Sequence, residues 1–261
     1  MNNKSEVLEN FQQLLELEYT GTTPENYVGY VSDFLDFSSN VPDRVTNNDV
    51  LSYNIYLCNF SYSYRNCALS AIKAYFRLYL KRKIKGLSFK RPKKQFKQPK
   101  VIDAYALSDK IKSIENKKHK AILALGLSGW LRRSEVINLK ITDIDSDRMR
   151  IKINQSKGAK DREVELSEST LKILRDYVRE YRPTEYLFNG QKKAKYSGTS
   201  INNISHKFLG CRFHCLRASG STFALANGTD IKTISEILGH SKIQTTRHYI
   251  PTLYQNIKQA I

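Results

Sequence analysis

The sequence lacks the long apolar runs that mark membrane proteins. No stretch of its 261 residues stays apolar over the roughly 18 positions that a membrane-spanning helix needs. The opening segment MNNKSEVLENFQQ has neither the charged start nor the short apolar core of a signal peptide. We therefore expect a soluble, cytoplasmic protein with no membrane partner.

Cysteine is also scarce, with four residues and no CxxC pair. A chain of this size without a secretion signal does not need disulfides to fold, so we expect Cys58, Cys67, Cys211 and Cys215 to be free thiols. A zinc site on Cys211, His214 and Cys215 is an alternative. It is disfavoured because the three side chains are too crowded on one helix for ordinary ligand geometry. We expect no metal and no cofactor.

Acidic residues are few, and one stretch has none. The chain has 43 Lys and Arg against 25 Asp and Glu, a net charge of +18. Residues 1–80 carry −4, whereas residues 81–100 have ten basic side chains and no acidic one. Such an excess points to a polyanionic partner, although a solvated linker would explain the basic run alone. The residues of this stretch that we expect to contact nucleic acid are Lys90, Arg91, Lys93, Lys94 and Lys97.

The basic stretch divides the chain into two predicted domains. We expect an N-terminal helical domain at 1–83, a basic linker at 84–104 and a second domain at 105–261. In the first, Pro24 resembles a proline of the first helical turn, and apolar side chains follow at helical spacing. With 5–19, 47–59 and about 68–80 as further helices, the domain reads as a bundle of about four helices.

The second domain begins with a helical pattern over 107–139, in which Ser108 can act as a cap. Apolar residues then alternate on both sides of the turn SKGAKD, which predicts a β-hairpin. Further helices are predicted at 168–181 behind Ser167, at about 200–208, at 214–226, and at 231–238 between a Thr229 or Asp230 cap and Gly239. The expected fold class is therefore mainly α: a helical bundle plus a mixed, mostly helical domain with a small antiparallel sheet.

Six residues of the second domain could carry chemistry, although each has an ordinary structural explanation when taken alone. They are Arg132, Lys157, His214, Arg217, His240 and Tyr249. Together they meet the needs of metal-free phosphoryl transfer. Two guanidinium groups match the charge that spreads over phosphate oxygens in the transition state. A tyrosine hydroxyl, with an ordinary pKa of about 10, needs cations and a base such as histidine to become a nucleophile.

The order of these residues resembles the tyrosine recombinase family, which includes the phage integrases and the Xer recombinases. Five of the family's motifs occur in the family's order: SGWLRRSEVINL, QSKGAK, HCLR (214–217), LGH (238–240) and TTRHY (245–249). The N-terminal bundle resembles the family's core-binding domain by architecture alone.

The resemblance implies a site-specific recombinase that clamps double-stranded DNA and acts as a tetramer on paired sites. Arg132 and Arg217 would hold the scissile phosphate, and Tyr249 would attack it to form a 3′-phosphotyrosine intermediate. His214 would serve as base and acid for the tyrosine, Lys157 as acid for the leaving oxygen, and His240 as a hydrogen-bond donor. Strand exchange would pass through a Holliday junction.

Some alternatives stay open at this point. Similar chemistry supports a type IB topoisomerase-like strand nicker, and the same fold supports a DNA-binding relative without catalysis. Two residues, Trp130 and Leu131, separate the Ser-Gly turn from Arg132, where the family usually has one, so Arg133 is a second candidate. Lys160 lies three residues after Lys157 and competes for the same role. The apolar stripe of the tail at 250–257 can dock on its own domain or on a neighbouring subunit.

Overall fold

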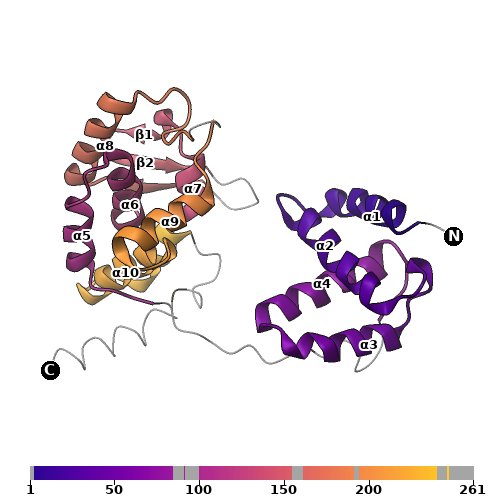
Figure 1. Ribbon diagram of the computed structural model, residues 1–261. Helices are drawn as coiled ribbons and strands as arrows, with labels where there is room; N and C mark the ends of the chain where they lie inside the picture. Colours follow the sequence, from indigo (N-terminus) through magenta and orange to yellow (C-terminus); the bar gives the residue numbers. More distant parts are fainter. Residues whose placement is uncertain are drawn as a thin grey trace. The chain divides into compact units, whose positions relative to one another are not determined.

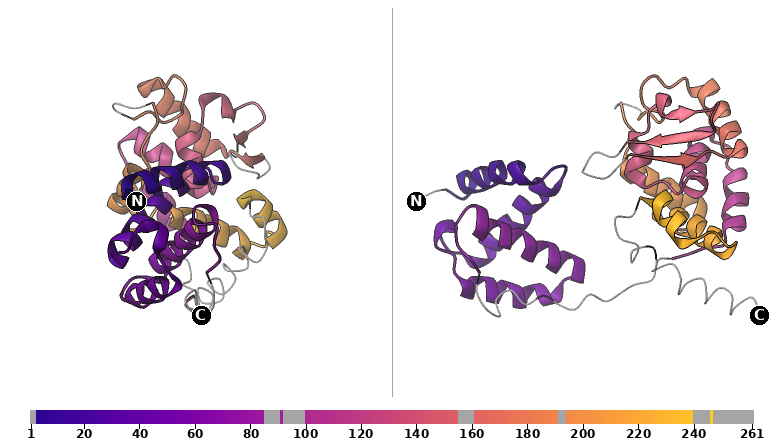
Figure 2. Two further views of the ribbon diagram at one scale, coloured as in Figure 1. Left: turned by 90° about the vertical axis from the view of Figure 1, so that its right-hand side faces the viewer. Right: turned by 180° about the vertical axis from the view of Figure 1, so that it is seen from behind.

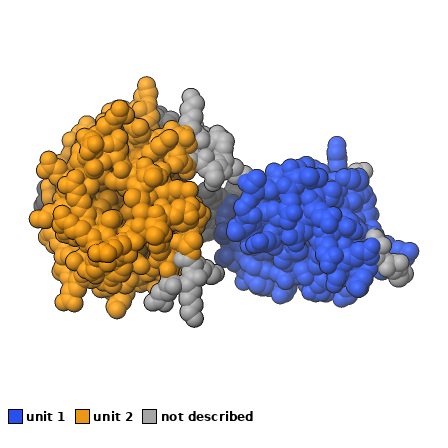
Figure 3. All heavy atoms as spheres, turned by 90° about the horizontal axis from the view of Figure 1, so that it is seen from above, with its two compact units in different colours: residues 1–96 blue, residues 97–261 orange. Residues whose placement is uncertain are grey.

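The computed structural model describes residues 3–84, 91, 100–154, 161–190, 194–239 and 246. The chain divides into two compact units, residues 1–96 and 97–261 (Figure 3). The linker at 84–104 falls largely outside the described residues, and its bounds stay a prediction.

The first unit is the predicted bundle of helices (Figure 1). Its helices are α1 (Lys4–Glu18), α2 (Thr23–Ser38), α3 (Asn47–Tyr56) and α4 (Tyr62–Leu78), with short 3-10 turns at Pro42–Arg44 and Leu57–Asn59. Helix α2 packs on α4, and α1 packs on both.

Local capping and an aromatic core explain these helices. Thr46 and Asp49 form a reciprocal capping box at the start of α3, and the Ser61 hydroxyl accepts from the Tyr64 amide at the start of α4. Phe11 and Tyr75 meet edge to face in the fully buried core. Burial of each large apolar side chain is worth about 1.5–3 kcal/mol.

The second unit combines seven α-helices, a short 3-10 turn at Ile141–Asp143 and three strands in its described part (Figures 1 and 2). The helices are α5 (Ala104–Lys112), α6 (Lys117–Ser128), α7 (Arg133–Asn138), α8 (Glu168–Tyr181), α9 (Gly198–Leu209), α10 (His214–Ala226) and α11 (Ile231–Leu238). The strands are β1 (Ile144–Asp145), β2 (Arg150–Ile153) and β3 (Arg162–Glu165). Helix α6 packs on α8 and on α10, so it forms the centre of the unit.

The small sheet is antiparallel in the order β1-β2-β3. The predicted hairpin is confirmed as β2 and β3, where Ile151 pairs with Val164 and both side chains are buried. The third strand, β1, is not predictable from the sequence because two residues are too few to show an alternating pattern.

Most of the helix ends that the sequence predicts in this unit are confirmed, and one is not. Ser167 caps α8, and Asp230, one of the two predicted candidates, caps α11 before Gly239 ends it at a φ of 60°. The prediction that Ser108 caps a helix is wrong. The Asp103 carboxylate accepts from the Ala106 amide instead, so α5 begins earlier and Ser108 lies inside it.

Within the described ranges, every helix is too short or too polar to cross a membrane.

Candidate active site

Arg132 is held in place by a carboxylate one helical turn away. It lies immediately before α7, where its main-chain amide and its Nη1 both donate to the Glu135 carboxylate at 2.7 Å. Its Nη2 donates to the Gly239 carbonyl at 2.9 Å, which joins the start of α7 to the end of α11. About a third of the Arg132 side chain stays exposed, at 34%. The guanidinium is therefore both oriented and accessible.

Arg217 approaches the same carboxylate from α10. Its Nη1 donates to the Trp130 carbonyl at 2.7 Å and lies 3.9 Å from Glu135 Oε2, while its Nη2 donates to the Leu238 carbonyl. Its side chain is 1% exposed. The structure thus brings together two of the predicted arginines, which are far apart in the sequence.

Arg162 completes the cluster and is not among the residues predicted from the sequence. It projects from β3 and donates through Nη1 and Nη2 to both oxygens of Glu135 at 3.0 and 2.9 Å. Its Nε donates to the Ile237 carbonyl at 2.7 Å. No local pattern signals this pair, because 27 residues separate the two side chains.

The cluster carries a net positive charge, since three guanidinium groups surround one carboxylate. Burial opposes ionisation of Glu135, but hydrogen bonds from Arg162 and Arg132 outweigh it and lower its pKa. The carboxylate therefore stays ionised at neutral pH. Such a site is electrostatically suited to an anion beside the exposed part of Arg132.

His214 begins α10, one turn before Arg217, and its side chain is exposed. Partial loss of solvation, followed by the positive charges of Arg217 and Arg132, lowers its pKa from the usual value near 6.5. The imidazole is therefore neutral at neutral pH and able to accept a proton.

Trp130 provides the main-chain carbonyl that holds Arg217. Its φ of 50° lies in the left-handed region, a strained conformation for a bulky side chain. The indole packs against α10 at Gly220, where an added Cβ would lie 2.6 Å from Trp130 Cδ1 and 2.4 Å from the Leu127 carbonyl oxygen. Two residues, Trp130 and Leu131, precede Arg132 after the Ser-Gly turn. The left-handed backbone of Trp130 and the missing side chain of Gly220 make room for them.

Arg133 has a different environment from Arg132. Its side chain is exposed on α7 and lies beside Gly198 at the start of α9, where an added Cβ would be 3.1 Å from its Nε. Within the described residues, Glu135 interacts with Arg132, Arg162 and Arg217, and not with Arg133.

Several predicted residues lie outside the described residues: Lys157, Lys160, His240, Tyr249, Lys90, Lys93, Lys94, Lys97 and the tail at 250–257. Arg91 is described. It is exposed, and its guanidinium donates to Asn66 on α4 at 2.9 Å and to the Ser70 hydroxyl at 3.1 Å.

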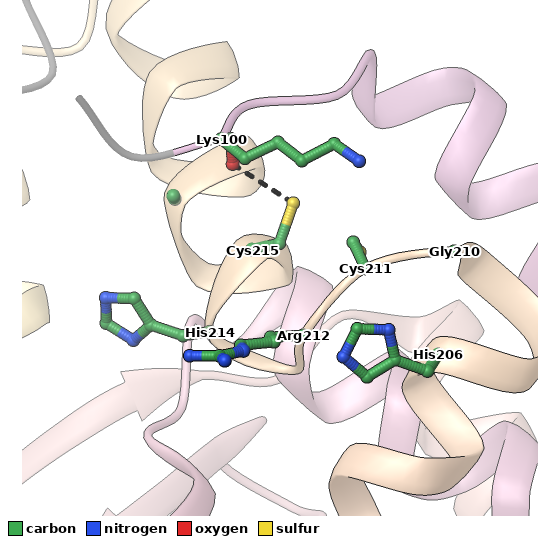
Figure 4. A pocket seen from close by; sticks show the side chains of 8 residues that line it. Lys100, His206, Gly210, Cys211, Arg212, His214 and Cys215 are labelled. Atoms are coloured by element: carbon green, nitrogen blue, oxygen red, sulfur yellow. Dashed lines mark hydrogen bonds between the residues drawn. The ribbon is translucent and has the colours of Figure 1, made fainter. Parts of the chain in front are cut away.

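A cavity of about 340 Å³ lies beside the start of α10 (Figure 4). It is lined by Lys100, His206, Gly210, Cys211, Arg212, His214, Cys215 and Ala218. In Figure 4 the His214 ring lies apart from the two cysteine side chains. Among the described residues, no three His, Cys, Asp or Glu side chains are arranged to hold a metal ion.

Comparison with known proteins identifies the two halves of the chain. Residues 100–256 match the phage integrase family, and residues 7–86 match the phage integrase N-terminal SAM-like domain. Tyrosine recombinase XerA of Pyrococcus horikoshii is 31% identical over 98% of this chain and 93% of its own length. Tyrosine recombinase XerC of Myxococcus xanthus is 27% identical over 99% of this chain and 97% of its own length.

A solved structure gives the same fold. The XerH site-specific recombinase bound to its difH substrate superposes with a TM-score of 0.76, at 17% identity, over 95% of this chain and 82% of that one. The chain belongs to the phage integrase family of tyrosine recombinases, site-specific enzymes that cleave and rejoin DNA. The predicted fold and reaction class are confirmed, and no finding favours the topoisomerase-like or catalytically silent alternatives.

Proposed function

We propose that this recombinase cleaves DNA with Tyr249 while Arg132 and Arg217 hold the scissile phosphate. The observation that carries the proposal is the convergence of both arginines on Glu135 from separate segments of the chain. A tetrahedral phosphate presents several oxygens, so two planar guanidinium groups can each donate paired hydrogen bonds to it.

The reaction needs one bond to form and one to break at phosphorus. Tyr249 Oη attacks the phosphorus, its proton passes to the neutral imidazole of His214, and the bond to the 5′ oxygen breaks. Lys157, or Lys160 in the same turn, protonates the departing oxygen, and His240 donates a hydrogen bond to the phosphate. The 3′-phosphotyrosine bond keeps the energy needed for rejoining, so no cofactor is required.

Arg217 is almost fully buried in the structure, and a phosphate can reach it only if one face becomes accessible. We therefore place Arg132, which is partly exposed, as the first residue to meet the incoming phosphate, with Arg217 engaged as DNA binds. His214 is exposed beside them and is well situated for proton transfer.

Double-stranded DNA is the proposed partner, and the basic residues Lys90, Arg91, Lys93, Lys94 and Lys97 are proposed to contact its backbone. Two structures with the same fold support this partner: the XerH recombinase is bound to its difH substrate, and the Tn1549 transposon integrase is in complex with transposon right end DNA. Exchange of strands between two sites requires four cleavages, so we propose a tetramer on paired sites and a Holliday junction between the two rounds of exchange.

The test compares alanine substitutions at two adjacent arginines. The substrates are DNA fragments selected because the protein binds them. Replacing Arg132 by Ala should lower the rate of covalent adduct formation by about a hundredfold, the usual scale for one transition-state donor. Replacing Arg133 by Ala changes the same charge one residue away and should have little effect. A larger defect in Arg133→Ala than in Arg132→Ala would move the clamp to Arg133.

A further inference from the structure

Two cysteines that the recombination reaction does not use share the cavity at the start of α10. Cys211 lies in the loop between α9 and α10, and Cys215 lies in the first turn of α10. Both are buried from bulk solvent, at 2% and 6% exposure, yet both line the cavity. In Figure 4 the Cys215 sulfur is directed at the Lys100 carbonyl, and Cys211 lies on the loop that leads into α10.

The two thiols interact with each other. The neighbouring Cys215 lowers the pKa of Cys211, and the positive charge of Lys100 lowers it further. The neighbouring Cys211 and burial raise the pKa of Cys215. One thiol is therefore biased toward the reactive thiolate, and its neighbour remains a protonated partner, which is the usual arrangement of a nucleophilic and a resolving cysteine.

The pair also lies at a structural junction. The Cys215 thiol donates to the Lys100 carbonyl at 3.0 Å, and the Ile102 amide donates to the Ser219 hydroxyl at 2.9 Å. These hydrogen bonds attach the segment that precedes α5 to helix α10. His214 directly precedes Cys215, and Arg217 follows His214 by one turn. A displacement of the first turn of α10 therefore also moves His214 and Arg217.

We propose that Cys211 and Cys215 form a redox modification site that opens into this cavity, and that their disulfide switches recombination off. The reagent is a small oxidant such as a peroxide. The Cys211 thiolate attacks one oxygen of hydrogen peroxide, the O–O bond breaks, and hydroxide leaves, so Cys211 becomes a sulfenic acid. The sulfur of Cys215 then attacks Cys211, the S–S bond forms, and water leaves. Overall, the two thiols lose two hydrogens, and the peroxide is reduced to two waters.

Closing this bridge removes the donor to the Lys100 carbonyl and draws the first turn of α10 toward the preceding loop. The effect on activity rests on the proposed role of His214, whereas formation of the disulfide does not. The two claims therefore need separate measurements.

The experiment uses the full chain with Cys58 and Cys67 both replaced by Ser, because these thiols lie in the other unit and Cys58 is exposed. After treatment with hydrogen peroxide, intact-mass spectrometry should show the loss of two hydrogens, and dithiothreitol should restore them. A further Cys215→Ser change keeps a hydroxyl donor for the Lys100 carbonyl but removes the resolving thiol. That variant should show no such loss and should instead form a sulfenic acid that dimedone traps at Cys211.

Adduct formation with DNA is measured on the same samples. It should be lost on oxidation and regained on reduction in the protein that keeps Cys211 and Cys215. Absence of the two-hydrogen loss would overturn the modification site. A disulfide that forms without any change in adduct formation would overturn the switch. A reduced protein that forms no adduct would contradict the proposed function. The mass measurement would then still test whether the two thiols form a disulfide.

Discussion

Glu135 organises the candidate site at the scale of single residues. Its carboxylate accepts hydrogen bonds from Arg132 and from Arg162 and lies within ion-pair distance of Arg217. Because Glu135 and Arg162 are both more than nine-tenths buried, removal of the carboxylate leaves an uncompensated charge in a poorly solvated place.

Replacing Glu135 by Gln should lower the free energy of unfolding of the second unit by about 3–5 kcal/mol, the range for breaking a buried ion pair from one side. Trp130 is the only tryptophan of the chain, so its fluorescence in a denaturant titration reports on this unit. Glu180→Gln is the matched control, because its pair with Lys117 is about half exposed and its removal should change stability little. Equal stability of the two variants would show that Glu135 does not hold the cluster together.

The residues of the site differ in how far the sequence reveals them. Arg132, His214 and Arg217 are visible because each lies in a short motif with its own spacing, and the structure places the two arginines on one carboxylate. Arg162 is not visible, because its role depends on the packing of β3 against α7 and α11, which only the fold creates.

Helix α10 carries His214 and Arg217, and its position depends on Gly220. A glycine inside a helix normally costs about 1 kcal/mol relative to alanine. At this position an added Cβ would overlap the Leu127 carbonyl oxygen and the Trp130 indole, so the helix could not stay where it is. The close approach of α10 to Leu127 and Trp130 therefore explains why position 220 is a glycine, although helix propensity disfavours that residue.

The change Gly220→Ala should lower the melting temperature measured by circular dichroism and displace α10 from the Trp130 carbonyl. Gly29→Ala is the contrasting variant, because Gly29 lies inside α2 with nothing within 4 Å of the added Cβ. There the usual helix propensity should apply, and the melting temperature should rise. A stabilising effect at both glycines would contradict the tight packing of α10 on the Trp130 turn.

Element boundaries are predictable where a local signal sets them. Ser167, Asp230 and Gly239 act within one turn of the chain, so the ends of α8 and α11 follow from the sequence. The helical pattern over 107–139 covers more than one element, since it contains the end of α5 and the two helices α6 and α7. The side chain of Asn116 accepts from the His119 amide and starts α6, a cap that the apolar spacing does not reveal.

Charge is distributed unevenly over the whole molecule, since residues 1–80 carry −4 and the remainder carries +22. DNA binding releases a counterion for each phosphate that a basic side chain neutralises, so affinity should fall steeply as salt rises. Neutralising Lys90, Arg91, Lys93, Lys94 and Lys97 together should flatten the log–log dependence of affinity on salt by about 0.9 for each phosphate no longer neutralised. Fluorescence anisotropy with a labelled duplex measures this slope. An unchanged slope would show that the stretch is only a soluble connector.

The covalent adduct between the chain and DNA tests the central proposal most directly. The wild-type chain should form a denaturant-resistant adduct through a 3′-phosphotyrosine, and peptide mapping should place it on Tyr249. Tyr249→Phe removes only the hydroxyl, so that variant should bind DNA with wild-type affinity and form no adduct. An adduct that persists in Tyr249→Phe would contradict the assignment of Tyr249 as the nucleophile.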